Sequence, residues 1–216
     1  MEIRRINSYT DERFSKKILF EHGAYLIDGD PYEVEIISPD EAIVRGKDQS
    51  LYRQLIEEFR FHAPQILRFY DDAKKPIAEY PTVSLFEIGL DKIQPSQFFI
   101  DEDKLAAVSS FIEKPEDIVI QVMPYEDRFI SLDGHTRLYL AAMRGYASVK
   151  AVVSEADDSI WIFVKEAERR KIFHPRDMTL LSHEKYTIQW DGYCDIVFEN
   201  LAKGDEEKNE VQTWGI

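Results

Sequence analysis

The fold of this chain is decided by the stretch RFISLDGHTRLYLAAMRG, residues 128–145. Its apolar first part predicts a strand over residues 128–132, which ends at Asp133 and Gly134. Apolar residues then recur at helical spacing, which predicts a helix over residues 134–144. Gly145 stands just beyond the C-cap, where glycine is favoured. A strand that leads directly into a helix indicates a unit of mixed α and β structure.

The turn between this strand and helix has the chemistry of an anion site. The first turn of a helix leaves backbone N–H groups without partners, and the helix dipole places positive charge there. Asp133 is a suitable N-cap, Gly134 lets a ligand approach the backbone closely, and His135 and Arg137 can add donors. The same residues could instead be structural, with Asp133 only capping, His135 bonding to backbone and Arg137 pairing with a carboxylate. The local pattern leaves both interpretations open.

Strands and helices alternate on both sides of this turn, over residues 81–155. We expect strands at 83–90, 117–123, 128–132 and 149–153, helices at 101–112 and 134–144, and a loop at 92–97. The order strand, helix, strand, strand, helix, strand is typical of an α+β (mixed α/β) domain.

Two further regions flank this domain. Residues 1–80 predict an N-terminal α+β subdomain with helices at 11–20 and 49–71, the second kinked at Pro64, strands at 25–27, 33–37 and 42–44, and a linker at 74–81. Residues 156–216 predict a helical C-terminal extension with helices at 158–171 and 183–201 and a frayed polar end from Lys203.

Composition limits the classes of function. The 216 residues carry 41 acidic and 27 basic side chains, a net charge of −14. This balance argues against a nucleic-acid partner, because such proteins neutralise phosphates with Lys and Arg. Cys194 is the single cysteine, so an intrachain disulfide and a Cys-based zinc site are excluded and a cytoplasmic location is expected. Without a signal peptide or an apolar stretch of about 20 residues, no membrane partner is expected.

The segment LDGHTRLYLAAMRG, residues 132–145, followed by the strand at 149–153, resembles the signature of the ParB/sulfiredoxin superfamily. That signature is a strand, a Gly-x-x-Arg helix start, a helix of small residues, a glycine and a strand. The segment LDKIQP, residues 90–95, is similar to the family's opening strand-to-loop element. The resemblance covers residues 83–153. It implies a ParB/sulfiredoxin-like core that binds a nucleotide or phosphorylated group at the helix start.

The branches of this superfamily differ in the residues at the turn. Sulfiredoxin chemistry needs a cysteine where this chain has His135 and Thr136. ParB partitioning proteins carry a following helix-turn-helix domain, for which residues 156–216 show no motif. The turn is most similar to the Asp-Gly-His-His-Arg of free-serine kinases, from which Thr136 departs. That branch has a glutamate base at the position of Gln97, and glutamine cannot accept a proton.

The resemblance therefore implies a nucleotide-binding protein that could be a phosphotransferase acting on a hydroxyl-bearing metabolite, with Mg²⁺ and ATP or ADP as cofactors. Two alternatives stay open, a non-catalytic module gated by a nucleotide and a ParB-like nucleic-acid-associated protein. The chain could also form a homodimer. The expected catalytic residues are Asp133, which would also hold Mg²⁺, His135, and Asp101 as a substitute base; the expected phosphate-binding residues are Ser96, Gln97, Gly134, His135, Thr136 and Arg137.

Overall fold

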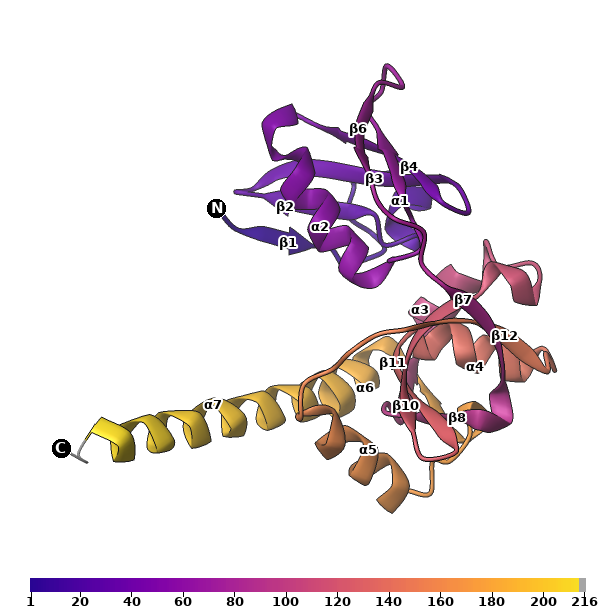
Figure 1. Ribbon diagram of the computed structural model, residues 1–216, viewed down its shortest axis with the longest axis vertical. Helices are drawn as coiled ribbons and strands as arrows, with labels where there is room; N and C mark the ends of the chain where they lie inside the picture. Colours follow the sequence, from indigo (N-terminus) through magenta and orange to yellow (C-terminus); the bar gives the residue numbers. More distant parts are fainter. Residues whose placement is uncertain (214–216) are drawn as a thin grey trace.

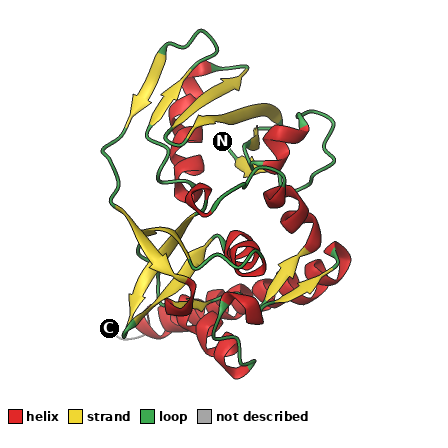
Figure 2. Ribbon diagram, turned by 90° about the vertical axis from the view of Figure 1, so that its right-hand side faces the viewer, coloured by secondary structure: helices red, strands yellow, loops and turns green. Residues whose placement is uncertain are grey.

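The computed structural model describes the backbone of residues 1–213 and the side chains of residues 1–203, and these form an α+β fold (Figures 1 and 2). The described residues contain three β-sheets. One sheet belongs to the N-terminal half of the chain, and the other two belong to the remainder. None of the described helices has the length and apolar character that crossing a membrane requires.

The N-terminal half is a six-stranded sheet covered by two helices, with strand order β1-β2-β3-β4-β5-β6. All neighbouring strands are antiparallel except β4 and β5, which are parallel and joined through α2. The elements are β1 (Ile3–Arg5), α1 (Lys16–Phe20), β2 (Ala24–Ile27), β3 (Asp30–Ser38), β4 (Glu41–Gly46), α2 (Tyr52–His62), β5 (Arg68–Tyr70) and β6 (Pro76–Glu79).

The three predicted strands of this half are confirmed, but both predicted helices are shorter than expected. Helix α1 begins only at Lys16, because Ser15 caps it by accepting from the Ile18 N–H. Helix α2 ends at His62, two residues before Pro64, rather than continuing through a kink. Part of the predicted linker at 74–81 is strand β6, so the connection between the two halves is reduced to residues 80–84.

The central domain is built on a five-stranded mixed sheet with the order β7-β12-β10-β11-β8. Its predicted strands and helices are confirmed, whereas the predicted loop at 92–97 is wrong, because it contains strand β8. A separate parallel pair joins β9 to β13. The elements are β7 (Leu85–Gly89), β8 (Ile93–Pro95), β9 (Phe99–Asp101), α3 (Glu102–Ser109), β10 (Val119–Tyr125), β11 (Arg128–Asp133), α4 (His135–Met143), β12 (Ser148–Val153) and β13 (Thr179–Leu181).

The C-terminal region is mainly helical, with α5 (Ile160–Arg169), α6 (His183–Tyr186), a π-helical turn (Thr187–Asp191) and α7 (Gly192–Thr213), but it also contributes strand β13, which the sequence did not predict. Its apolar residues Ala167, Ile172 and Met178 join the core of the central domain. Helix α7 extends away from the body of the molecule (Figure 1). It continues to Thr213, beyond the predicted helix end at residue 201, and residues 214–216 of the predicted polar end lie outside the described residues.

Two separate hydrophobic cores result from this architecture. The buried clusters of the N-terminal half lie within residues 3–80, and the cluster of the central and C-terminal regions lies within residues 86–193. Among the described residues, one hydrogen bond links the two halves, from Gln121 Nε2 to the Phe61 carbonyl at 2.7 Å. The halves are therefore joined mainly by the chain between them and by the surfaces that face each other.

Candidate functional site

Strand pairing brings the two sequence motifs to one edge of the central sheet. Strands β8 and β11 are parallel, and Pro95 lies opposite Ser131. The residues that follow each strand, Gln97 after β8 and Asp133 at the end of β11, therefore meet at the carboxyl edge, where ligands bind in many α/β sheets. Strand β10 is antiparallel to β11 and begins at the same edge with Val119.

The turn from β11 to α4 depends on Gly134. Its φ angle is +87°, a conformation that residues with a Cβ rarely adopt, and a Cβ there would lie 2.8 Å from Ile120 Cγ2. Gly134 itself is the N-cap, so the expected capping role of Asp133 is wrong. Asp133 Oδ2 instead accepts from Arg137 Nη2 at 2.8 Å. Arg137 also donates from Nη1 to the Val119 carbonyl, which fixes the guanidinium beside the helix start.

His135 lies in a buried serine cluster beneath this turn. Its Nε2 accepts from the Ser96 N–H at 3.3 Å and lies 2.9 Å from Ser131 Oγ. Because Nε2 is an acceptor, the ring proton is assigned to Nδ1. Burial lowers the pKa of His135 to about 4, so the ring is neutral near pH 7. This arrangement fits a residue that shapes the turn better than one that transfers a proton.

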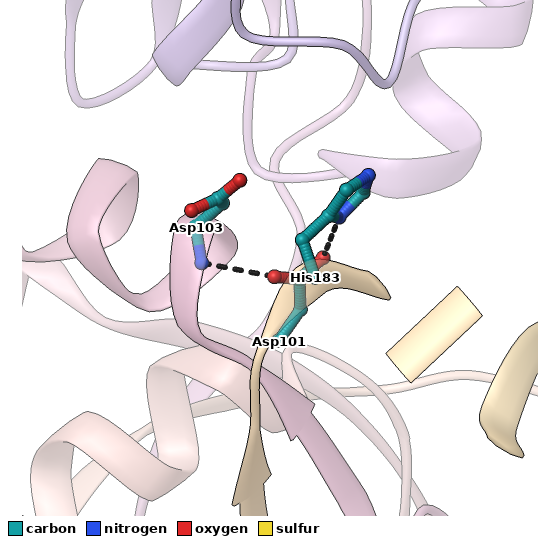
Figure 3. A group of neighbouring side chains, drawn as sticks. All are labelled: Asp101, Asp103 and His183. Carbon is teal, nitrogen blue, oxygen red and sulfur yellow. Dashed lines mark hydrogen bonds and ion pairs between the residues drawn. The ribbon is translucent and has the colours of Figure 1, made fainter. Parts of the chain in front are cut away.

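Ser96 and Asp101 are both buried and are engaged by protein groups. Ser96 Oγ donates to the Ser131 carbonyl at 2.8 Å. Asp101 caps α3 by accepting from the Asp103 N–H at 2.9 Å, and its Oδ2 lies 2.8 Å from His183 Nδ1 (Figure 3). Neither residue lines the cavity described below, so the geometry does not support Asp101 as the base or Ser96 as a phosphate contact.

Asp101, Asp103 and His183 form the one group of three metal-ligating side chains found among the described residues, with their ligand atoms within 4.8 Å of one another (Figure 3). Both Asp101 oxygens already accept hydrogen bonds within the group. The bond to Asp101 raises the pKa of His183. These contacts explain the cluster as a connection between α3 and α6 without a metal ion.

A cavity of about 870 Å³ lies between the N-terminal sheet and the start of α4. The predicted residues that line it are Gln97, Asp133, Gly134, His135, Thr136 and Arg137. Gln97 uses its amide Nε2 to donate to the Phe99 carbonyl and lies 3.3 Å from the Tyr186 hydroxyl. The opposite wall comes from the N-terminal half, including Arg5 on β1, His22 and Tyr25 at the start of β2, and His62 at the end of α2.

The cavity contains cations that lack carboxylate partners. Arg5 and Lys104 line it from opposite halves, and neither has an ion-pair partner among the described residues. Lys104 Nζ lies 3.4 Å from the Tyr186 hydroxyl and 4.6 Å from the centre of its ring. Burial lowers the pKa of Lys104, and Arg5 adds to this effect against the opposing influence of nearby carboxylates.

Buried polar groups lie on the N-terminal wall. The side chain of Tyr25 is fully buried and its hydroxyl lies beside Arg5, whereas His22 Nδ1 has no hydrogen-bond partner among the described residues. Burial lowers the pKa of His22 to about 3 and that of His62 to about 4, and Arg5 and Arg137 lower both further. The positive charges of both walls are therefore close enough to act on the same side chains.

The sequence did not identify this second wall. Arg5, His22 and Tyr25 belong to segments with no local motif, and they reach the site only when the N-terminal sheet forms. Lys104 carried a usable signal, because helical spacing over the predicted helix 101–112 puts it on one face with Val108 and Phe111, which also line the cavity. A lysine on the apolar face of a predicted helix is a reason to look for an anion.

Comparisons with known proteins give no assignment. No family model matches the chain, and no curated protein matches it. Among solved structures, the crystal structure of protein Atu1540 from Agrobacterium tumefaciens is similar over 44% of this chain and 61% of that chain, with 16% identity and a TM-score of 0.32. The match thus spans less than two thirds of that protein's length. A TM-score this low carries no conclusion about fold or function.

Proposed function

We propose that this protein binds a nucleotide, or another phosphorylated small molecule, in the cavity between the N-terminal sheet and the start of α4. The supporting observation is that three of the five lysines and arginines that line the cavity, Arg5, Lys104 and Arg137, act on the same side chain, His22, near the beginning of a nine-residue helix. The first N–H groups of such a helix lack intrahelical partners and favour negative charge. Arg137 is already oriented by Asp133 and Val119, so little side-chain entropy is lost when it binds.

The size and lining of the cavity suit a nucleotide. Ligand pockets commonly enclose about 300–1,000 Å³ and combine apolar walls with a few polar groups. Here the apolar wall includes Phe59, Val108 and Phe111, of which Phe111 is 39% exposed and can contact a base. Among the polar groups of the lining, Asp133, Thr136 and Arg137 lie at the start of α4, where the phosphates would lie.

A phosphotransferase that acts on a hydroxyl-bearing metabolite, with ATP or ADP as donor, is the catalytic form of this proposal. Asp133 is 39% exposed and could hold Mg²⁺ together with phosphate oxygens, which is how Mg²⁺ is commonly bound. Gln97 cannot act as a base, and Asp101 is engaged by His183. The arrangement of side chains therefore supports a proposal of nucleotide binding more strongly than one of phosphotransfer. A cytoplasmic location is part of the proposal, with Cys194 as a free thiol.

Thermal stability with ligands tests the proposal. ADP, ATP, CTP and pyrophosphate, each with and without Mg²⁺, are added to the full chain. A bound ligand at a hundredfold its dissociation constant should stabilise the wild type by about 2.7 kcal/mol. Lys104→Gln should reduce this effect, whereas Lys92→Gln, an exposed lysine outside the cavity paired with Asp127, should not. The proposal fails if none of the four ligands stabilises the wild type.

A further inference from the structure

We propose that the ligand bridges the two halves of the molecule, with Arg5 and Lys104 contacting one polyanion that carries at least two negative charges, as pyrophosphate and nucleoside diphosphates do. This inference rests on the proposed function and names its ligand class. It also gives the N-terminal sheet a role, because half of the binding site belongs to it.

The charges around His22 set the minimum charge of the part of the ligand that would lie there. Arg137 is neutralised by Asp133 at 2.8 Å, so it adds little net charge. Near His22, Arg5 and Lys104 remain, one on each wall, with no carboxylate paired to either among the described side chains. Lys114 and Lys150 line the cavity as well, together with the carboxylates of Glu21, Glu116 and Asp117. Two unpaired cations in a partly enclosed space repel each other, and the repulsion grows as water is excluded. A ligand with two or more negative charges neutralises both.

The connection between the halves allows a ligand to change their relative position. Their cores share no residue, and the bond from Gln121 to the Phe61 carbonyl is the one hydrogen bond between them in the described part of the chain. Figures 1 and 2 show the two sheets joined by the extended segment before β7. Without ligand, like charges face each other across this junction. With ligand, two charge-assisted contacts replace that repulsion, so binding should draw the halves together.

An unpartnered polar atom on the N-terminal wall is a second and independent observation. Tyr25 is fully buried and lines the cavity, and the side chain of Arg5 is the group close enough to interact with its hydroxyl. His22 Nδ1 lies on the same wall and has no hydrogen-bond partner among the described residues. Buried polar atoms are nearly always hydrogen-bonded, so such an atom beside a cavity indicates a bound group. Its position beside Arg5, rather than beside α4, requires that group to reach the N-terminal half.

Affinity measurements separate the bridge from simple binding to α4. Pyrophosphate and inorganic phosphate are titrated calorimetrically into the full chain, and pyrophosphate should bind more tightly. Arg5→Gln should weaken pyrophosphate binding by about tenfold or more, the usual effect of losing a hydrogen bond to a charged group. Arg5→Lys should restore part of it. Arg4→Gln is the matched control, because Arg4 is exposed on the same strand and does not line the cavity.

Spin labels measure the movement of the two halves. Arg53→Cys on α2 and Met143→Cys on α4 place exposed labels on opposite halves, with Cys194→Ser removing the native thiol. Saturating pyrophosphate should shorten and narrow the distribution of distances between the two labels in this protein. When Arg5→Gln is added, pyrophosphate should leave that distribution unchanged. Normal binding by Arg5→Gln, or an unchanged distribution in the presence of bound pyrophosphate, overturns the bridge and leaves the proposed function intact. Absence of any binding to the wild type overturns both.

Discussion

At the scale of single residues, Gly134 makes the most specific prediction about the turn. Gly134→Ala should destabilise the fold for two reasons: the φ angle at this position is +87°, and the added Cβ would lie 2.8 Å from Ile120 Cγ2. Gly145→Ala is the matched control, because it has a φ of +72° but open space around the added methyl. Left-handed backbone costs a non-glycine residue about 1–2 kcal/mol, and overpacking adds about 1–3 kcal/mol. Urea denaturation should therefore show a larger loss for Gly134→Ala. Equal losses would mean that the turn tolerates the methyl group.

His135 gives a second prediction at this scale, on the pH dependence of stability. Burial lowers its pKa to about 4, whereas in the unfolded chain it returns to about 6.5. Between these values the unfolded chain binds a proton that the folded chain excludes. The free energy of unfolding should therefore fall as the pH is lowered from about 6.5 to 4, by at most about 1.4 kcal/mol per pH unit for this group.

Urea titrations between pH 7 and 4.5 measure this slope. His135→Gln should reduce it without abolishing it, because the pKa values of His22 and His62 are lowered in the same direction by burial. His183→Gln is the control, since the pKa of His183 is raised by Asp101 and its contribution has the opposite sign. An unchanged slope in His135→Gln would contradict the buried neutral state of this residue.

At the scale of elements, Asp101 connects α3 to α6. Asn is as good an N-cap as Asp, so Asp101→Asn should keep the start of α3 and remove the charge beside His183. The pKa of His183, followed by NMR, should then fall toward its usual value. Because the pKa of His183 is raised in the folded protein, its contact with Asp101 stabilises the fold fully at pH values below the pKa of the unfolded chain. This stabilisation is lost as the pH rises through the pKa of the folded protein. Asp103→Asn, at an exposed neighbour that acts on His183 through its charge but without the direct bond, should lower the pKa less; equal shifts would refute the connection.

The same scale shows what the sequence can and cannot predict. The unit from β11 to α4 was predicted correctly because its signals are local, an apolar strand, a glycine and a small-residue helix. Strands β8, β9 and β13 have three residues each, too few for a periodic pattern, and they exist only through partners far away in the sequence. The capping role of Asp133 failed because the left-handed Gly134 moves the helix start by one residue and frees the carboxylate for Arg137.

The candidate site likewise has one part that local sequence signals predict and another part that depends on contacts between distant segments. Residues 133–137 were identified from one contiguous motif, and the cavity does contain them. Arg5, Tyr25 and Lys104 are missing from that prediction because the site is completed by the packing of two separately folded units. A sequence motif identifies the residues on one wall of such a site. The residues on the other wall can be identified only once the fold is known.

At the scale of the whole molecule, the two cores predict two unfolding transitions. Leu55 is fully buried in the core of the N-terminal half, and Ile118 is fully buried in the core of the central domain. Truncating either to alanine costs about 2–5 kcal/mol, which in domains of this size lowers a transition by on the order of 10 °C. Because so little connects the halves, calorimetry of the ligand-free protein should show Leu55→Ala lowering one transition and Ile118→Ala lowering the other.

A bridging ligand changes this expectation. A ligand that contacts both halves binds fully only when both are folded, so each core gains stability from the other. Pyrophosphate should therefore raise both transitions of the wild type and bring them closer together, and in the Arg5→Gln variant it should raise only the transition that Ile118→Ala lowers. A single ligand-free transition that both alanine variants shift would show that the halves are already coupled through their facing surfaces. In that case the two halves behave as one rigid body. The ligand would then neutralise the repulsion between Arg5 and Lys104 without moving the halves relative to each other.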